Sequence, residues 1–360
     1  MKVAFIARSS LYSSKGGDTI QMLQTARHLE QLNIEVDIRL THEKINYSQY
    51  DLLHFFNLIR PADILPHIKY ARKPFVVTPL LIDYSEYDKK YRKGFSGKIF
   101  HHFSKDQIEY IKTIARWAKG QQKVKSYSYL YKGQRNSVKN IIQKAAMFLP
   151  NSEMEYQKLV ESYSLTPPYF IVPNGIDENL FAFRDEPQKD KNMVLCVARI
   201  EGLKNQHNLI KALNNSHYQL FIIGSSASNQ SFYNNQCRKS AAENIHFIDH
   251  LPQEKLIKYY QQAKVHILPS WFETCGLSTL EAAAMGCNVV ITNRGYASEY
   301  CKNHAFYCEP SSPSSIFEAV TKASKAGTSK IFQQKIFTHY TWRNAAEKTC
   351  EVYHKILSQT

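Results

Sequence analysis

The stretch Pro269-Ser270-Trp271-Phe272-Glu273-Thr274-Cys275-Gly276-Leu277-Ser278-Thr279-Leu280-Glu281-Ala282-Ala283-Ala284-Met285-Gly286 decides the fold class. The residues before it, 265–268, form a short apolar run typical of a buried strand, and residues 277–285 have the small side chains of a helix that packs closely on a sheet. A strand that leads through a loop into a helix is the repeating unit of a parallel α/β sheet, and ligands bind in such loops. The stretch therefore predicts a ligand site on an α/β fold.

The same loop can bind phosphate and hydroxyl groups. The first backbone N–H groups of a helix have no partner within the helix, and they attract a phosphate or a sugar oxygen. We expect these to be the N–H groups of Cys275, Gly276 and Leu277. The carboxylates of Glu273 and Glu281 can accept hydrogen bonds from neighbouring hydroxyl groups. Taken alone, Glu281 would be an ordinary acid on a helix surface.

Short apolar runs alternate with amphipathic stretches on both sides of this segment. The pattern predicts strands at 2–7, 34–40, 51–56, 74–79, 146–150, 193–198, 218–224, 245–248, 265–268 and 287–292. It predicts helices at 19–32, 153–163, 206–213, 232–242, 253–262, 277–285, 314–324 and 343–357. A polar stretch, 177–191, interrupts the rhythm and is interpreted as a linker. The expected fold is α/β, with two Rossmann-like, doubly wound domains facing each other across a cleft.

Composition agrees with two globular domains. The 360 residues include 43% hydrophobic and 21% charged residues, which excludes a collagen, a disulfide miniprotein and a disordered chain. Seven cysteines are an odd number and include no C-x-x-C pair, so neither a disulfide framework nor a zinc site is expected. Neither a signal-peptide core nor an apolar stretch of about 18 residues occurs, so we expect a cytoplasmic protein.

Two other loops are candidates for phosphate binding. Arg199 and Lys204 follow the predicted strand 193–198, and two cations in one strand-end loop suit a diphosphate, although either alone would be an ordinary surface charge. Gly16 and Gly17 follow the first strand and let the backbone approach a ligand closely, or they form a flexible turn before a capped helix. The fingerprints G-x-G-x-x-G and G-x-x-x-x-G-K-[ST] are absent, which disfavours a dehydrogenase and an NTPase.

Together these motifs resemble the retaining glycosyltransferases of family four. Glu273 and Glu281 are similar to the E-x7-E signature of that family, and Arg199 with Lys204 is similar to its donor-diphosphate pair. The remaining matches are the interdomain element Pro173-Asn174-Gly175-Ile176-Asp177, the first loop with Gly16 and Gly17, and Tyr340-Thr341-Trp342 before the closing helix. They occur in family order along the whole chain.

The resemblance implies the architecture called GT-B and a role for each matching residue. Residues 1–172 would form the acceptor domain, residues 173–340 the nucleotide-sugar donor domain, and helix 341–360 would return to the first domain. Arg199, Lys204 and Glu273 would be the catalytic set, with the two cations neutralising the departing diphosphate and Glu273 orienting the transferred sugar. The implied donor-binding residues are Glu281, which would hold the ribose, and Cys275, Gly276, Leu277, Gly16, Gly17 and Asn174.

The expected reaction is transfer of a sugar from a nucleotide diphosphate sugar, first of all a UDP-sugar, to a glycan or lipid-linked glycan. No Asp-x-Asp motif occurs, so the activity is expected to need neither a metal nor another cofactor. Members of the family often have a histidine after the strand that corresponds to 74–78, and this chain has none there. His54 and Asp83 are the candidates on the acceptor side, although a packed strand histidine is the stronger interpretation of His54.

Two other functions stay open. One is a nucleotide-sugar epimerase or a phosphorylase on the same fold. The other is a non-catalytic protein that binds a nucleotide sugar or a nucleic acid.

Most of the charge lies in one insert. Residues 89–144 hold 15 Lys and Arg against two acids, which is +13 of the chain's net +15, together with nine aromatic residues. A solvated helical surface, contact with an anionic membrane and binding of single-stranded nucleic acid all fit this composition. Nucleic acid comes last because no nucleic-acid motif accompanies the insert. A peripheral protein at the inner face of the membrane would suit a lipid-linked acceptor.

Overall fold

The computed structural model describes residues 1–13, 16–83, 86–88, 103–120, 126–182, 189–227 and 230–359. The chain forms two compact units. The first comprises Met1–Ile82, Lys93–Asn174 and Trp342–Thr360, and the second Asp83–Arg92 and Gly175–Thr341. The sequence placed residues 83–92 in the first domain, whereas their contacts group them with the second unit. The change of unit after the first domain falls between Asn174 and Gly175, inside the expected interdomain element.

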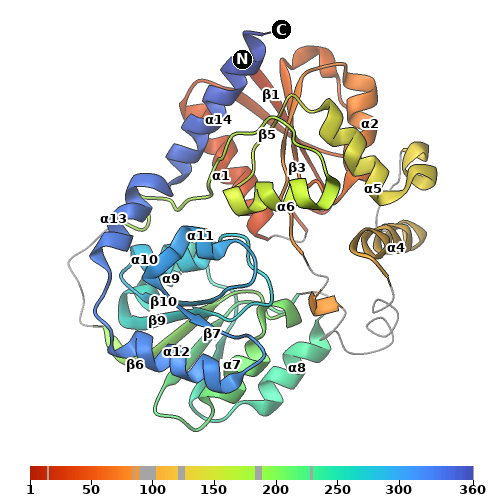
Figure 1. Ribbon diagram of the computed structural model, residues 1–360. Helices are drawn as coiled ribbons and strands as arrows, with labels where there is room; N and C mark the ends of the chain where they lie inside the picture. Colours follow the sequence, from red (N-terminus) through yellow and green to blue (C-terminus); the bar gives the residue numbers. More distant parts are fainter. Residues whose placement is uncertain are drawn as a thin grey trace. The chain divides into compact units, whose positions relative to one another are not determined.

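The first unit is a parallel five-stranded sheet between helices (Figure 1). Its strand order is β2-β1-β3-β4-β5, from β1 (Lys2–Ala7), β2 (Glu35–Leu40), β3 (Leu52–Phe56), β4 (Phe75–Thr78) and β5 (Met147–Phe148). Its helices are α1 (Gly17–Gln31), α2 (Pro61–Ala71), α4 (Lys105–Ala118), α5 (Tyr127–Lys144), α6 (Glu153–Tyr163) and α14 (Trp342–Leu357), with the short 3-10 turn Tyr47–Gln49. The last helix, α14, packs on α1.

The second unit is a parallel six-stranded sheet of order β11-β10-β9-β6-β7-β8. Its strands are β6 (Asp190–Val197), β7 (Gln219–Ile223), β8 (Ile245–Ile248), β9 (Ala263–Leu268), β10 (Asn288–Thr292) and β11 (Ala305–Cys308). Its helices are α7 (Gln206–Leu213), α8 (Ser231–Ser240), α9 (Gln253–Gln262), α10 (Leu277–Ala284), α11 (Ala297–Cys301), α12 (Pro313–Lys325) and α13 (Lys330–His339), with 3-10 turns at Gly202–Lys204 and Lys302–His304.

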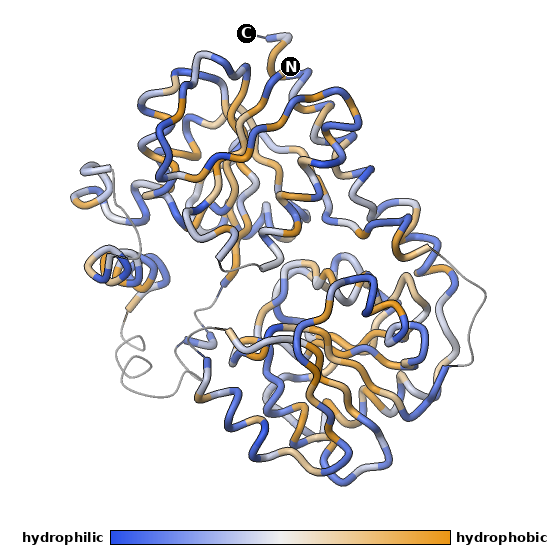
Figure 2. The backbone as a smooth tube through the Cα atoms, turned by 180° about the vertical axis from the view of Figure 1, so that it is seen from behind, coloured by the Kyte–Doolittle hydropathy of each residue, from blue (hydrophilic) through white to orange (hydrophobic). Residues whose placement is uncertain are grey.

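Both faces of the second sheet are buried, which explains its continuous apolar strands. Alternate residues of β6 pack into different cores: Met193 and Leu195 face α10 and α13, whereas Val194 and Cys196 face α7 and α12. Figure 2 shows apolar residues concentrated along the central strands of each unit. The expected fold class, with two Rossmann-like α/β domains, is therefore confirmed.

Each sheet reverses its strand order once. In the first sheet the reversal lies between β1 and β3, and in the second it lies between β6 and β9. The loops that leave such a pair of strands diverge to opposite faces of the sheet, so the crevice outside their carboxyl ends is where open α/β sheets bind ligands. The two crevices are therefore the places to look for function.

Several elements differ from the sequence prediction. Helix α2 was missed because Pro66 lies within it and removes one backbone donor, and β11, α11 and α13 were missed as well. Two parts of the basic insert, 105–118 and 127–144, are the helices α4 and α5, while 89–102 and 121–125 lie outside the described residues. All seven cysteines are free, and six are buried. Among the helices of the described residues, none is long and apolar enough to cross a membrane.

Candidate active site

A lysine and a glutamate form the centre of the crevice in the second unit. Lys204 follows β6 and Glu273 follows β9, and the Lys204 Nζ lies 2.6 Å from the Glu273 Oε2. Their side chains are 17% and 16% exposed, so the pair is largely shielded but still reachable from solvent. Burial alone would lower the pKa of Lys204, but the charges of Glu273 and Glu201 outweigh it and raise that pKa above its ordinary value. Lys204 is therefore a permanent cation at the point where the strand order reverses.

Glu273 is positioned through its backbone by the loop that follows β10. Its N–H donates to the carbonyl oxygen of Arg294 over 3.1 Å, and its carbonyl accepts from the N–H of Tyr296 over 2.8 Å. Gly295 lies between these two partners with a φ of +94°, and a Cβ at this position would overlap the backbone of Glu273. Glycine is required here both for the left-handed backbone and for the close approach. The sequence analysis did not identify this support.

The loop of Lys204 is held by a buried asparagine. Asn205 is 4% exposed, and its amide donates to the carbonyl oxygens of Pro269 and Pro310 over 3.0 and 2.7 Å. It therefore ties the loops after β6, β9 and β11 to one another. The N–H of Trp271 also donates to the carbonyl of Leu203 over 2.9 Å, which closes the 3-10 turn against the loop of Glu273.

Arg199 is the more accessible of the two predicted cations. Its guanidinium lies 3.1 Å from Glu201 Oε1 and is 44% exposed, whereas its carbonyl oxygen accepts a hydrogen bond from Gln206. An exposed ion pair of this kind contributes little to stability, so the guanidinium can exchange its partner for an anionic ligand at low cost.

The start of α10 has the geometry of an anion-binding site. Gly276 precedes the helix with a φ of +68°, Leu277 is its first residue, and Cys275 is buried beside them. The Oγ1 of Thr279, in the first turn, is buried and has no hydrogen-bond partner among the described residues. The first N–H groups of an α-helix are free for a ligand, and its dipole favours an anion there.

Glu281 lies on the same helix but is largely buried. Its two carboxylate oxygens accept from Gln253 Nε2 over 2.6 Å and from the Tyr260 hydroxyl over 2.9 Å, and the residue is 6% exposed. Burial raises its pKa to about 7, although both hydrogen bonds act in the opposite direction. The carboxylate is thus held in one orientation and titrates near neutral pH.

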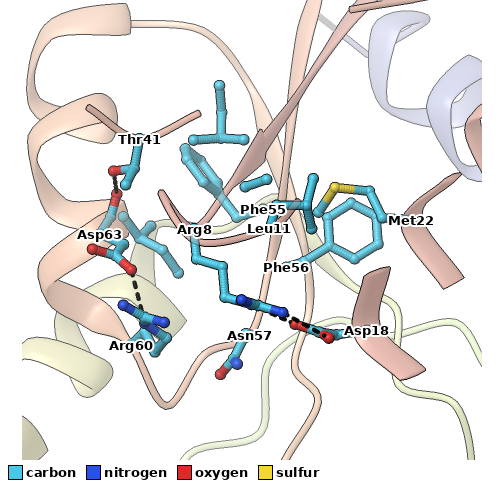
Figure 3. Close-up of a pocket in the computed structure, with 13 residues that line it drawn as sticks. Arg8, Leu11, Asp18, Met22, Thr41, Phe55, Phe56, Asn57, Arg60 and Asp63 are labelled. Atoms are coloured by element: carbon cyan, nitrogen blue, oxygen red, sulfur yellow. Dashed lines mark hydrogen bonds and ion pairs between the residues drawn. The ribbon is translucent and has the colours of Figure 1, made fainter. Parts of the chain in front are cut away.

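In the first unit, the corresponding crevice is lined by ion pairs, as Figure 3 shows. Arg8 follows β1, and its guanidinium lies 2.7 and 3.1 Å from the two carboxylate oxygens of Asp18. The same group donates to Ser10, and Arg60 pairs with Asp63 over 2.9 Å. Arg8 was not among the residues predicted from the sequence, although Arg8 follows the first strand of its sheet much as Arg199 follows β6.

The remaining predicted residues lie in different surroundings. Gly16 precedes α1 and Gly17 is its first residue, next to Asp18. Asn174 is buried at the change between the two units. Asp83 begins the segment that is grouped with the second unit. No group of three or more metal-binding side chains occurs in the part of the chain that the structure describes.

His54 is a core residue and does not line an open site. Its ring nitrogens lie 2.6 Å from the Tyr353 hydroxyl of α14 and 2.8 Å from the Thr78 hydroxyl, and the residue is 1% exposed. Burial lowers its pKa to about 3, so the ring is neutral. The structure thus favours the packed strand histidine over an acceptor-side group, because both nitrogens already have protein partners.

The second unit is similar to a known protein family. Residues 177–335 match the model of the glycosyl transferases group 1. These residues make up most of the second unit, which is therefore similar to the group 1 glycosyl transferases. The match contains Arg199, Lys204, Glu273 and Glu281, whereas Gly16 and Gly17 lie outside it.

Curated relatives and solved structures show further similarities. The chain is 28% identical over 196 residues to a glycogen synthase of Mycobacterium tuberculosis, which is 51% of this chain and 47% of that protein. The chain spans about half the length of the curated relatives it matches. The fold is similar to that of a sucrose-phosphate synthase from Thermosynechococcus elongatus, with a TM-score of 0.77, 15% identity and 100% of both chains covered.

A second solved structure is Anabaena Alr3699/HepE in complex with UDP-glucose, with a TM-score of 0.72, 16% identity, and 99% of this chain and 100% of that chain covered. At these identities the structural likeness establishes the GT-B fold alone. The family model matches most of the second unit, and the glycogen synthase matches about half of the chain.

Proposed function

We propose that this protein transfers a sugar from a nucleotide diphosphate sugar, first of all a UDP-sugar, to a glycan or lipid-linked glycan. The observation that carries the proposal is the pair of Lys204 and Glu273, which lies at the strand-order reversal of the transferase domain, with Arg199 in the same strand-end loop as Lys204. The relation to a glycogen synthase and the fold shared with a protein that binds UDP-glucose support a nucleotide-sugar donor.

In this reaction the residues have separate tasks. The diphosphate of the donor replaces Glu273 as the counter-ion of Lys204, and Arg199 binds its second charge. The bond between the anomeric carbon and the diphosphate oxygen breaks, the acceptor oxygen bonds to the same carbon, and the acceptor proton passes to the leaving diphosphate. Glu273, released from Lys204, accepts hydrogen bonds from the sugar hydroxyls, and the start of α10 stabilises the developing phosphate charge. Glu281 holds the ribose.

We propose further that the configuration of the anomeric carbon is retained and that no metal ion takes part. Attack and departure on the same face of the sugar need no protein nucleophile, and two cations with a helix start supply the charge that a divalent ion would bring to a diphosphate.

A donor panel tests the proposal directly. Purified protein is mixed with UDP-, GDP- and ADP-sugars and with glycan and lipid-linked acceptors, and both nucleotide release and acceptor product are measured. We expect product with one nucleotide sugar, a product linkage of the same anomeric configuration by NMR, and an unchanged rate in EDTA. Nucleotide binding without product would overturn the transfer reaction and indicate a binding protein, and interconversion of the donor sugar would indicate an epimerase.

The basic insert is the proposed membrane contact of the first unit. Tyr127 and Tyr131 lie one turn apart at the start of α5 and are 82% and 77% exposed, and Trp117 of α4 is 45% exposed. Aromatic side chains among cations bind the interface of an anionic bilayer, where each nearby cation contributes about 1 kcal/mol. Neutralising four further cations of the insert would also test this contact. They lie outside the described residues and are Lys89, Lys90, Arg92 and Lys93.

Vesicle sedimentation tests this contact. We expect binding to vesicles that contain phosphatidylserine, weaker binding in high salt, and weaker binding of the double variant Tyr127→Ala/Tyr131→Ala. Phe232→Ala is the matched control, because Phe232 is 76% exposed on α8 of the second unit. Equal sedimentation of all three proteins would contradict the proposal.

A further inference from the structure

A short segment from the first half of the sequence contacts the loop of Lys204 and the loop after β10 that supports Glu273. Residues 86–88 belong to the stretch 83–92, which is grouped with the second unit and leads directly into the basic insert. In Figure 1 residues 86–88 are drawn in orange. The family model begins only at residue 177, so it does not include this segment.

The first contact is made by Tyr87 with the loop of Lys204. The hydroxyl end of the Tyr87 side chain lies against Gly202, the first residue of the 3-10 turn that ends at Lys204. A Cβ on Gly202 would overlap the hydroxyl oxygen and the neighbouring ring carbons of Tyr87. The absence of a side chain at residue 202 therefore makes room for the tyrosine, and the φ of Gly202 is not in the left-handed region that would by itself demand glycine.

The second contact is made by Glu86 with the loop after β10, which holds the backbone of Glu273. The Glu86 Oε2 lies 3.2 Å from Nη1 of Arg294, whose other terminal nitrogen lies 3.3 Å from Glu309. Arg294 is the residue whose carbonyl accepts the N–H of Glu273. Glu86 thus acts on the backbone partner of Glu273, while its neighbour Tyr87 acts on the turn of Lys204.

We propose that Glu86 and Tyr87 are positioning residues that hold the loops of Lys204 and Glu273 in register for donor binding. The proposal rests on the proposed function. Tyr87 contacts the turn of Lys204 directly, and Glu86 contacts Arg294, whose carbonyl accepts the N–H of Glu273, so two adjacent side chains act on both members of the 2.6 Å pair. Because the same segment leads into the basic insert, the geometry of the donor site depends on a part of the chain that lies outside the family match.

A steric double-mutant cycle tests the contact of Tyr87 with Gly202. We expect Gly202→Ala and Tyr87→Ala each to raise the KM for the donor about five- to tenfold, because each moves the turn of Lys204, while kcat falls less. In the double variant the added methyl group has room, so the two effects should not multiply. Tyr87→Phe keeps the ring and should stay within about twofold of the wild type. The proposal would be overturned if the increases in KM multiplied in the double variant, or if the KM of each single variant stayed within twofold of the wild type.

Hydrogen exchange in the ligand-free protein separates this proposal from the proposed function. In Tyr87→Ala and Glu86→Ala we expect faster exchange of the amides of Lys204 and Glu273, and unchanged exchange in β7 and β8. Glu347→Ala is the matched control, because Glu347 pairs with Arg343 over 3.1 Å on α14 of the first unit. Unchanged exchange at both amides would overturn the positioning role. If no nucleotide sugar is turned over but the exchange changes, the proposed function is wrong, and the positioning role of Glu86 and Tyr87 still holds.

Discussion

The two sheets use a basic residue at the same topological place for different purposes. Arg8 follows β1 and Arg199 follows β6, and each of these strands borders the reversal of its sheet. Arg8 is 14% exposed and gives its donors to Asp18, Ser10 and Thr19, whereas Arg199 is 44% exposed and has one acidic neighbour. A guanidinium whose donors are all used stabilises a loop, while one that keeps solvent-facing donors can bind a ligand.

The two crevices can also be compared by the acidic partners of their cations. In the first unit the pairs Arg8–Asp18 and Arg60–Asp63 balance each other locally. In the second unit Lys204 pairs with Glu273, whose Oε2 also accepts from the Ser270 hydroxyl over 3.3 Å, while Arg199 pairs with Glu201 but is 44% exposed. Both crevices therefore balance their charges, and they differ in that the guanidinium of Arg199 is accessible to an anionic ligand whereas that of Arg8 is not. The following variants test this difference.

The largest effect is expected at the centre of the second crevice. Glu273→Gln keeps the size of the side chain but removes the charge that orients the sugar and pairs with Lys204, so kcat should fall about 10²–10³-fold. Lys204→Ala should cost as much, because the departing diphosphate loses a preorganised cation. The measurement is the initial rate with the donor found in the panel, with circular dichroism to verify folding. A Glu273→Gln variant that retains more than a tenth of the wild-type kcat would exclude the assigned role.

Arg199→Ala is expected to affect donor affinity with little effect on folding. A charged hydrogen bond to phosphate contributes about 1.5–3 kcal/mol, so the Kd for the nucleotide sugar should rise at least about tenfold. Its exposed pair with Glu201 contributes little to stability, and the melting temperature should stay within about 2 °C of the wild type. Titration calorimetry and thermal unfolding measure the two quantities. A large drop in stability would mean that Arg199 is a structural residue like Arg8.

Arg8→Ala should show the reverse pattern. It leaves Asp18 without its bidentate partner near the start of α1, so the free energy of unfolding should fall by about 1–3 kcal/mol. Donor affinity in the second unit should remain within about twofold of the wild type. Urea unfolding and calorimetry test both halves. If Arg8→Ala weakened donor binding as much as Arg199→Ala, the proposed division between the two crevices would be wrong.

Strands were predictable from the sequence where both faces of a sheet are covered. Strands β1 and β8 and helices α6, α7 and α9 were placed at their observed bounds, because buried apolar runs and amphipathic stretches alternate there without interruption. Strand β11 was missed because it is short and three of its four residues are only partly buried or exposed. Helix α13 was missed because polar residues separate its buried positions.

The site was predictable as far as its residues lie within a few positions of a strand end. The sequence indicated Arg199, Lys204, Glu273 and Glu281, and all four lie in the second unit, within the residues that match the family model. It could not indicate the supports, because Asn205, Arg294 and Tyr260 act through contacts between residues far apart in the chain. An acidic residue, Asp18, lies ten residues after Arg8 and could have indicated an ion pair. The sequence does not show, however, that the chain turns back so that the two side chains meet.

The smallest expected effect is a pH dependence of donor binding that comes from the buried carboxylate of Glu281. The pKa of Glu281 is raised by burial to about 7, and the ribose hydroxyls need the ionised form as acceptor, so donor binding should weaken as pH falls through neutrality. With this pKa the Kd for UDP-glucose should rise about threefold between pH 7.5 and 6.5. UDP-glucose is preferable to UDP here because both of its phosphates stay ionised in this range.

Glu281→Gln supplies the control for this pH dependence. Its amide cannot titrate, so its weaker binding should be the same at both pH values. The stability of the two proteins should also depend differently on pH. Because the raised pKa of Glu281 favours the folded state only when the group is protonated, the wild type loses stability as pH rises from about 4.5 through 7, and the glutamine variant does not. The variant should therefore gain on the wild type in unfolding experiments as pH rises. A flat Kd in the wild type together with parallel stability curves would mean that the Glu281 carboxylate, despite its burial, stays ionised throughout this range.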